Sequence, residues 1–445
     1  MKIADLKQKK ILVLGFGREG RETLKWIFET KISRKVAIAD EKAFDDFDLE
    51  GRRLLKKARK AKIKLFLGTD FPLAFEGIDV VIKTPGLPLR KIQKLLPRGC
   101  KVTSETEIFL KNCPAWVIGV TGTKGKSTTA SLIYHILKTA GFKTQLLGNI
   151  GIPPLSILPK LRAGQWCVYE MSSHQLDRLE ISPDISVFLN IYPEHLDYYK
   201  DFNEYFKAKA NIVLWQKKNG IFVYNGNSEL ITKLVKKTKA SAIDFNQIVI
   251  SNFVEENDLP ISPEIYRENI QAAIVVALAL RLEVEKIEKA LKSFKPLQHR
   301  MQYLGNYHGI DFYDDSLATI PEATIDAIKS LNGKVGSIIL GGYDRKIKYD
   351  QLALAITEAN IKKIAFFPES GKFMLSAIGD LCKKREIPLP DYIFASNMRQ
   401  AVEFCIKHTP QGMSCLLSCA APSFGLFKDY RDRGEQFKNE IIKYQ

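Results

Sequence analysis

The sequence predicts an α/β fold that is divided into three domains. At 445 residues, the chain is too long to form one ordinary hydrophobic core. Short apolar runs alternate with segments of helical apolar spacing, which is typical of parallel sheets covered by helices. Two of these runs end in glycine-rich turns, at residues 15–20 and 122–125, that lead into a helical segment. A strand, a tight turn and a helix in that order favour nucleotide-binding domains.

Composition and charge exclude several classes of protein. The chain has 45% hydrophobic and 26% charged residues, as soluble globular proteins do. No signal pattern follows Met1, and the apolar run at residues 272–280 is too short to cross a bilayer, so we expect a cytoplasmic protein without membrane contact. The seven cysteines lack metal-like spacing and indicate free thiols. The net charge of +17 is spread along the chain without an aromatic and basic RNA-binding motif, so we expect nucleotides rather than nucleic acid as ligands.

The first segment carries a fingerprint of dinucleotide-binding domains. An apolar run at residues 11–14 leads into G-x-G-x-x-G at residues 15–20 and a helix, and a second strand at 36–39 ends at Asp40. This pattern alone also fits other ligands or plain tight packing. A further strand at 79–83 ends in Thr84-Pro85-Gly86, at the edge where open α/β sheets bind ligands. We therefore predict a Rossmann-like domain over residues 1–104.

The second segment contains the most informative motif of the chain. An apolar run at 117–121 is followed by Gly122-Thr123-Lys124-Gly125-Lys126-Ser127-Thr128 and by an amphipathic stretch at 130–140. Such a loop points backbone N–H groups and a helix N-terminus at one spot, where they bind phosphate. Lys126 supplies a charge for the outer phosphates, and Ser127 or Thr128 a hydroxyl for Mg²⁺. Although Val120 stands where the general pattern has glycine, we predict a nucleoside triphosphate site; the alternative is a turn with a solvated lysine.

Three further side chains of this segment are candidates for chemistry. Glu170 ends a strand at 166–171 beside the phosphate loop, where it can bind Mg²⁺, and a surface carboxylate is the alternative. His195, after a strand at 185–190, is either a metal ligand or a capping group. Lys209, in a helix at 203–215, has the pattern of a solvated residue. With helices at 264–281 and 284–294, these elements predict a central P-loop ATPase-type domain over residues 105–297.

The third segment again alternates strands and helices. We expect strands at residues 333–340, 364–367 and 413–418, and helices at 352–359, 373–384 and 398–407. This order predicts a second Rossmann-like, doubly wound domain over residues 298–445. His299 and Arg300 mark the domain junction, where ligand clefts are common, and Asp314-Asp315-Ser316 ends another strand.

Taken in order along the chain, these motifs resemble those of the Mur ligases of peptidoglycan synthesis. The resemblance covers essentially the whole chain and lies in residues 122–128, Gly148-Asn149-Ile150-Gly151, residues 170–176 and 190–197, His299-Arg300 and Asp315-Ser316. Ser127, residues 341–345, 418–423 and 427–434 are similar to the members of the family that add D-glutamate.

The resemblance implies an ATP-dependent ligase that joins D-glutamate to UDP-N-acetylmuramoyl-L-alanine through an acyl-phosphate intermediate. Lys126 and Mg²⁺ would act on the ATP phosphates. Magnesium would be held by Ser127, Glu170, His195 and a carbamylated Lys209, in which a cation has become a carboxylate ligand. Lys126, Glu170, His195 and Lys209 would form the catalytic set, and the enzyme is expected to be a monomer.

The resemblance also implies three binding sites. The UDP-sugar would be bound by Arg18, Glu19, Asp40, Thr84, Pro85, Gly86, Asn149 and His195. ATP would be bound by Gly122, Thr123, Lys124, Gly125, Lys126, Ser127, Thr128, Asn269, Arg300 and Asp315. The amino acid would be bound by Thr319, Arg345, Ser423 and Tyr430, with Arg345 suited to a glutamate carboxylate.

The chain departs from the family pattern in two places, and alternatives stay open. Leu317 stands where relatives carry lysine, and residues 264–266 replace the usual Gly-x-His-Asn before Asn269. A related ligase that adds another amino acid, such as L-glutamate, is the nearest alternative. A catalytically inactive relative is another, and Leu317 is its best support. An NAD-dependent dehydrogenase built on the turn at residues 15–20 is a third, but the chain lacks a residue set for hydride chemistry.

Overall fold

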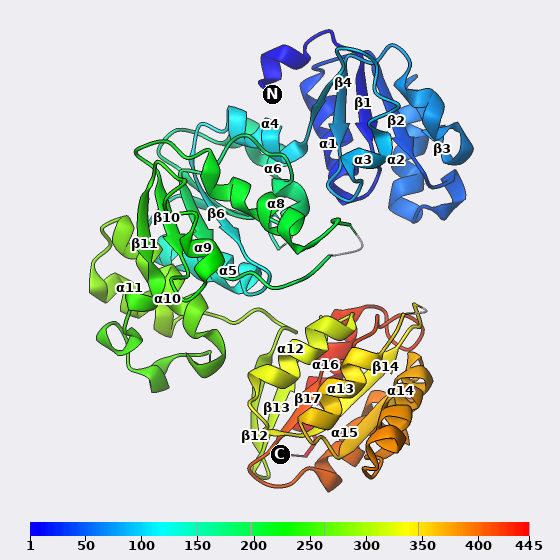
Figure 1. The fold of residues 1–445 in the computed structure, drawn as a ribbon, viewed down its shortest axis with the longest axis vertical. Helices are drawn as coiled ribbons and strands as arrows, with labels where there is room; N and C mark the ends of the chain where they lie inside the picture. The colour runs from blue at the N-terminus through cyan, green and yellow to red at the C-terminus, as the bar shows by residue number, and fades with distance from the viewer. Residues whose placement is uncertain (149, 196–197, 262, 346, 445) are drawn as a thin grey trace. The chain divides into compact units, whose positions relative to one another are not determined.

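The computed structural model describes residues 1–444 except 149, 196–197, 262 and 346 (Figure 1). It divides into two compact units, Met1–Phe294 and Lys295–Gln445. The first unit contains two parallel sheets and the second unit contains one mixed sheet, all of them accompanied by helices. The predicted α/β fold is therefore confirmed, while the predicted boundary between residues 104 and 105 stays a prediction.

The first sheet has the strand order β3-β2-β1-β4-β5, and its strands are parallel. Every residue of the central strand β1 is buried because helices cover both faces of a doubly wound sheet. The strands are β1 (Ile11–Leu14), β2 (Val36–Asp40), β3 (Lys64–Leu67), β4 (Val80–Lys83) and β5 (Lys101–Thr103). The accompanying helices are α1 (Arg18–Thr30), α2 (Leu49–Lys60) and α3 (Leu89–Ile92).

The second sheet has the order β11-β10-β9-β6-β8-β7 and is also parallel. Its strands are β6 (Trp116–Thr121), β7 (Thr144–Gly148), β8 (Trp166–Glu170), β9 (Ile185–Phe188), β10 (Ile221–Tyr224) and β11 (Ser241–Asp244). Its helices are α4 (Glu105–Asn112), α5 (Lys126–Thr139), α6 (Pro154–Ile157), α7 (Ser173–Leu176), α8 (Phe202–Leu214), α9 (Glu229–Thr232), α10 (Pro263–Ala279) and α11 (Val284–Lys292). Because β6 lies between β8 and β9, the loops that follow these three strands meet at one sheet edge.

Helix α5 packs against α10 and α11. Its apolar side chains join those of α10 in one buried cluster, which includes Leu132, Ile136, Ile270 and Ile274. This packing fixes the helix that begins directly after the phosphate loop.

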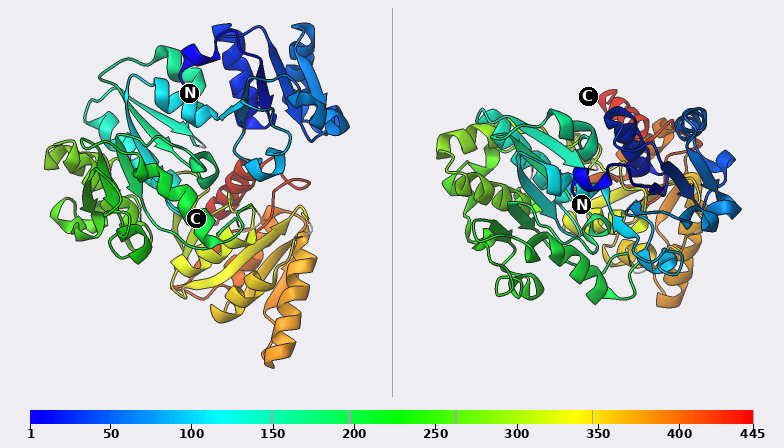
Figure 2. Two further views of the ribbon diagram at one scale, coloured as in Figure 1. Left: turned by 45° about the horizontal axis from the view of Figure 1, so that its top comes forward. Right: turned by 90° about the horizontal axis from the view of Figure 1, so that it is seen from above.

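The third sheet has the order β12-β13-β17-β14-β15-β16. Its strands are β12 (Gln302–Tyr307), β13 (Ile310–Asp314), β14 (Val335–Gly342), β15 (Lys363–Glu369), β16 (Asp391–Phe394) and β17 (Ser414–Leu417). Helices lie on both of its faces (Figures 1 and 2): α12 (Pro321–Ser330) contacts α13 (Asp350–Glu358), which contacts α14 (Ser370–Arg385), while α15 (Met398–His408) contacts α16 (Tyr430–Ile442).

The third sheet differs from the predicted pattern in one respect. Strands β12 and β13 pair antiparallel, whereas the other strands pair parallel. The two-residue turn between them has positive φ at both His308 (54°) and Gly309 (77°). Such a turn matches the twist of a hairpin, so the sequence His-Gly was the signal for this antiparallel edge.

In the part of the chain that the structure describes, no helix is long and apolar enough to cross a membrane.

Candidate active site

The phosphate loop connects β6 to α5 at the carboxyl edge of the second sheet. Gly125 is the N-cap residue of α5 and has a φ of +77°, a conformation that favours glycine. A Cβ at this position would lie 2.3 Å from Nδ2 of Asn269. That amide nitrogen donates to the Gly125 oxygen (3.1 Å) and to Oγ1 of Thr129 (2.9 Å). The structure thus places Asn269 directly against the phosphate loop.

Two lysines from different helices converge on one carbonyl of this loop. Nζ of Lys126, in the first turn of α5, donates to the oxygens of Gly122 (2.9 Å) and Thr123 (2.6 Å). Nζ of Lys209, in α8, donates to the same Gly122 oxygen at 2.7 Å. Lys209 is 1% exposed, so it is not the solvated residue that the pattern alone suggests. Burial, and then the nearby charge of Lys126, lower the pKa of Lys209 well below its usual value.

A buried hydroxyl and a buried carboxylate lie beside the lysines. Oγ of Ser127 donates to Oε2 of Glu170 at 3.1 Å, and both side chains are enclosed. Glu170 ends β8, the neighbour of β6, which explains why residues far apart in sequence meet here. Hydroxyl and carboxylate oxygens are ligands that Mg²⁺ prefers, and nucleotide phosphates commonly complete such a site. Among the described residues, no group of three or more His, Cys, Asp or Glu side chains could hold a metal ion.

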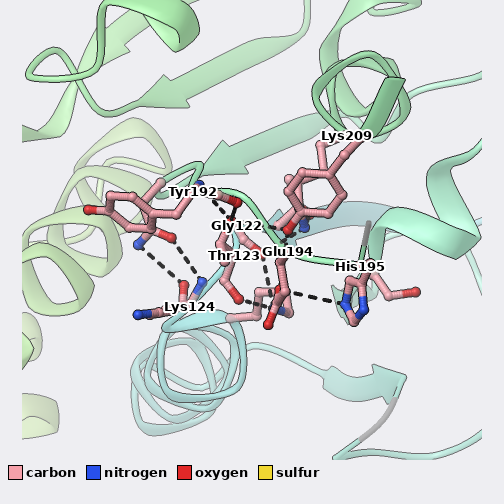
Figure 3. A network of polar contacts seen from close by, with 12 residues as sticks. Gly122, Thr123, Lys124, Tyr192, Glu194, His195 and Lys209 are labelled. Atoms are coloured by element: carbon pink, nitrogen blue, oxygen red, sulfur yellow. Dashed lines mark hydrogen bonds and ion pairs between the residues drawn. The ribbon is translucent and has the colours of Figure 1, made fainter. Parts of the chain in front are cut away.

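Thr123 is the centre of a polar network at the loop (Figure 3). Its backbone N–H donates to the oxygen of Asn190, and its Oγ1 accepts from the backbone N–H of Tyr192 at 3.0 Å. The hydroxyl of Tyr205 lies 3.1 Å from the same Oγ1 and donates to Oε2 of Glu194 at 3.3 Å. The Tyr205 side chain from α8 and backbone groups from the loop after β9 therefore hold the phosphate loop in place.

His195 lies at the outer side of this network. Its Nε2 is 3.5 Å from Oε2 of Glu194, and the side chain is 42% exposed. Its ring centroid is 4.7 Å from that of His174, which in turn is 4.3 Å from that of Tyr198. His195 has a φ of +56°, a backbone conformation that is costly for residues other than glycine.

Most of the residues expected to bind the UDP-sugar lie at the carboxyl edge of the first sheet, whereas His195 follows β9 of the second sheet. Asp40 accepts the backbone N–H groups of Phe16 and Lys42, so it fixes the glycine-rich turn. Nζ of Lys83 donates to the oxygens of Thr84 (3.0 Å) and Leu87 (2.8 Å), and burial lowers its pKa to about 8. The hydroxyl of Tyr198 donates to the Pro85 oxygen at 3.1 Å. These bonds shape the turn at residues 84–86. Asn149 lies outside the described residues.

Two of the expected UDP-sugar residues contact segments that follow strands of the second sheet. Arg18 donates to the oxygen of Gly151 at 3.2 Å. Oε1 of Glu19 accepts from Nε2 of Gln175 at 2.7 Å. Oε2 of Glu19 and Oε2 of Glu105 are buried and have no hydrogen-bond partner among the described residues. Burial is the main cause that raises the pKa of both carboxyl groups, to about 7 for Glu19.

The second unit holds the remaining candidate residues. Asp315 is buried, accepts from Oγ of Ser418 (2.8 Å) and from the backbone N–H of Met301 (3.2 Å), and burial raises its pKa to about 7. Nδ1 of His299 lies 2.7 Å from Oδ2 of Asp314. Ser423 is buried, Arg345 is exposed, and the other candidates of this unit, Arg300, Thr319 and Tyr430, are partly exposed. Leu317 is also partly exposed.

Sequence reasoning missed several residues that support these sites. Tyr205, Tyr198 and Lys83 each bond to a candidate loop, and Gln175 bonds to the candidate residue Glu19 in α1. None of the four stands in a glycine-rich turn. Gln175 had a signal: Ser172 and Gln175 form a capping box, with Oε1 of Gln175 accepting from the Ser172 N–H at 2.8 Å.

The comparison with known proteins identifies relatives along the whole chain. A family described as "Mur ligase middle domain" matches residues 120–277. The UDP-N-acetylmuramoylalanine--D-glutamate ligase of Acetivibrio thermocellus is 30% identical over 464 residues, which cover 98% of this chain and 97% of that protein. The protein of the same name from Clostridium kluyveri is 30% identical over 454 residues with the same coverage.

Solved structures share the fold at low sequence identity. MurF of Acinetobacter baumannii has a TM-score of 0.55 at 15% identity and covers 99% of this chain, with 93% of that chain matched. The MurF ligase of Thermotoga maritima, solved in complex with ADP, has a TM-score of 0.53 at 17% identity, with 100% and 97% of the two chains covered. At this identity the likeness supports the fold.

Proposed function

The chain belongs to the Mur ligase family, and we propose that it joins D-glutamate to UDP-N-acetylmuramoyl-L-alanine in peptidoglycan precursor synthesis. ATP is cleaved to ADP and phosphate in the reaction. Near-complete coverage of relatives with this activity in their name supports the assignment. A reaction on nucleotide-linked, charged precursors also fits the expected place in the cytoplasm. That the enzyme acts as a monomer stays a prediction.

The chemistry requires that an unreactive carboxylate be activated. The carboxylate oxygen of the L-alanyl group attacks the γ-phosphorus of ATP, the bond to the β-phosphate bridge oxygen breaks, and ADP leaves. The amine of glutamate then attacks the acyl carbon, loses a proton and expels phosphate, which forms the amide. Lys126 and the N–H groups of the phosphate loop would bind the charge that spreads over the transferred group. Mg²⁺, held by Ser127 and Glu170, would supply further charge neutralisation.

Lys209 would take part as a carbamate. Its amine is enclosed, and burial lowers its pKa well below the usual value, which favours the neutral form of the nitrogen, the form that reacts with CO₂. The product would offer anionic oxygen ligands beside the phosphate loop, in place of a second cation near Lys126. His195, which is exposed next to Glu194, would complete the metal and sugar contacts.

The substrates would occupy the three predicted sites. The uracil and diphosphate would lie near Arg18, Asp40 and the turn at 84–86, and Asn149 would contact the sugar-peptide. Asn269, Arg300 and Asp315 would contact the adenosine part of ATP, and Thr319, Arg345, Ser423 and Tyr430 would bind the amino acid. Arg345 offers a planar guanidinium that suits a side-chain carboxylate.

One observation carries the proposal: Lys126, Lys209 and the Ser127–Glu170 pair meet at the Gly122 turn, from three separate elements. The test is phosphate release by the purified protein, measured with ATP, UDP-N-acetylmuramoyl-L-alanine and a panel of D- and L-amino acids. We expect release that depends on all three substrates and is greatest with D-glutamate. Phosphate release with another amino acid would indicate that the protein is a related ligase that adds that amino acid. Nucleotide binding without phosphate release would indicate a catalytically inactive relative. Oxidation of NADH would support the dehydrogenase.

A further inference from the structure

Arg433 is a fully buried arginine in the first turn of α16. We propose that it is a positioning residue for the amino-acid site, where it holds together the loops that carry the residues expected to bind D-glutamate. The inference rests on the proposed function, because it concerns the second of the two chemical steps.

The guanidinium of Arg433 donates to two different loops. Its Nε donates to Oγ of Ser316 at 3.0 Å, and its Nη2 donates to the backbone oxygen of Ser316 at 2.8 Å. Its Nη1 donates to the backbone oxygen of Ala421 at 3.0 Å. Ser316 in turn donates from Oγ to the oxygen of Tyr430 at 2.7 Å. One side chain therefore joins the loop after β13, the loop after β17 and the start of α16.

A third loop is packed against the same group. Strands β13, β17 and β14 are neighbours in the sheet, so their carboxyl ends lie together. β14 ends at Gly342, where a Cβ would lie 2.2 Å from the oxygen of Pro422 and 3.4 Å from Nη1 of Arg433. The next residue, Tyr343, donates its backbone N–H to that Pro422 oxygen at 2.9 Å. The guanidinium thus bonds to two adjacent loop starts and lies beside the start of a third, which is bonded to Pro422.

The expected amino-acid residues lie a few positions beyond these supports. Thr319 follows Ser316, Ser423 follows Ala421, and Arg345 follows Gly342, each within three residues. Tyr430 lies one helical turn before Arg433 on α16 itself. A small movement of the guanidinium would therefore change the spacing of all four residues, whereas the phosphate loop belongs to the other unit.

The start of α16 has little room to move. A Cβ at Gly434 would lie 2.1 Å from Nδ1 of His299 and 2.5 Å from Oδ2 of Asp314. Those two atoms are themselves 2.7 Å apart. Because the helix start is fixed by this close contact, the direction of the Arg433 side chain is fixed as well.

Arginine suits this role better than lysine. Its planar group presents donors in a rigid fork that reaches two loops at once, whereas an ammonium is a point charge on a flexible stem. A buried cation is costly unless its donors are satisfied, and here three separate nitrogens are bonded. A lysine at this position would keep the charge but lose the bridge between Ser316 and Ala421.

Measuring the two half-reactions separately distinguishes a positioning role of Arg433 at the amino-acid site from a general effect on the whole enzyme. Acyl-phosphate formation needs ATP and UDP-N-acetylmuramoyl-L-alanine, and hydroxylamine traps the acyl group as a hydroxamate without any amino acid. Amide formation needs D-glutamate as well. For Arg433→Lys and Ser316→Ala, we expect hydroxamate formation within 3-fold of the unchanged protein. We expect the KM for D-glutamate to rise at least 10-fold in Arg433→Lys and about 3-fold in Ser316→Ala, with the KM for ATP unchanged.

Lys438→Met is the matched control, because it removes an exposed cation from the same helix. It should leave every KM unchanged. Circular dichroism and the melting temperature establish whether each variant is folded. If Arg433→Lys does not fold, the same measurements on Ser316→Ala still test the inference. The inference is overturned if folded variants keep the KM for D-glutamate, or if the KM values of all substrates rise together. A failure of the unchanged protein to release phosphate with any amino acid would instead refute the proposed function.

Discussion

Lys126 and Lys209 donate to one and the same carbonyl oxygen, that of Gly122, at 2.9 and 2.7 Å. Two ammonium groups that share an acceptor in an enclosed site repel each other, and the cost grows as water is excluded. The repulsion is relieved if one of the amines is neutral, and Lys209, with its lowered pKa, is the one that burial selects. This relationship is the reason for placing Lys209, which stands in an ordinary helical pattern, among the candidate site residues.

Lys209→Ala should reduce ligase activity at least ~100-fold, the size of effect seen when a positioned charged group is removed from an active site. If the lysine acts as a carbamate, acetate should restore part of the activity, because a small carboxylate can occupy the space of the missing oxygen ligand. Activity should be measured over an acetate series with formamide as a neutral control. Equal rescue by both additives, or none by acetate, would contradict a carbamate.

Lys126→Ala should reduce the rate of phosphate transfer much more than it weakens nucleotide binding. The ammonium neutralises charge that grows on the outer phosphates during transfer, so we expect a loss of about 10²–10³ in kcat. ADP binding, measured by calorimetry, should weaken less than 10-fold because the loop N–H groups remain. Lys124→Ala is the comparison variant for kcat and ADP binding. Lys124 donates its backbone N–H to Oδ1 of Asn190, and an alanine at this position keeps that donor. Unchanged turnover in Lys126→Ala would refute the assignment of the phosphate loop.

The sequence pattern predicted the phosphate loop and most strands and helices because these depend on local spacing. The apolar strand β6, the glycines and the helix α5 are consecutive, so their order is visible without any tertiary information. The burial of Lys209 is a long-range effect: it arises where α8 crosses the loop after β6, and no periodicity in residues 203–215 indicates it. The contact of Gln175 with Glu19 spans 156 positions and is equally invisible in either segment alone.

Gly125→Ala should disrupt nucleotide binding. Gly125 has a φ of +77°, and an added Cβ would lie 2.3 Å from Nδ2 of Asn269, so both the backbone and the contact would be strained. Backbone strain of this kind costs about 1–3 kcal/mol, which predicts a roughly 5- to 150-fold weaker Kd for ADP. Calorimetry should detect this change. Gly141→Ala, also at a positive φ but in open space after α5, is the control and should lower stability without weakening ADP binding.

Glu19→Gln should make the stability of the first unit less dependent on pH. The Glu19 carboxyl has Gln175 as its hydrogen-bond partner, with Glu105, Lys83 and Arg18 as the charged groups nearby. Its pKa in the folded state is about 7, above the value of 4.5 for an ordinary glutamate. The folded state therefore binds a proton that the unfolded state releases, and stability falls as pH rises from about 4.5 to about 7. Above that range the loss is complete.

The glutamine variant cannot ionise, so it should escape this loss. Between pH 5 and pH 8, the free energy of unfolding should decrease by about 2 kcal/mol more in the unchanged protein than in Glu19→Gln. Urea unfolding at several pH values measures the difference. Glu29→Gln alters an exposed carboxylate on the same helix α1 and should keep the full pH dependence. If Glu19→Gln shows the same slope as the unchanged protein, the Glu19 carboxyl is ionised throughout, and the enclosed contact with Gln175 does not retain a proton.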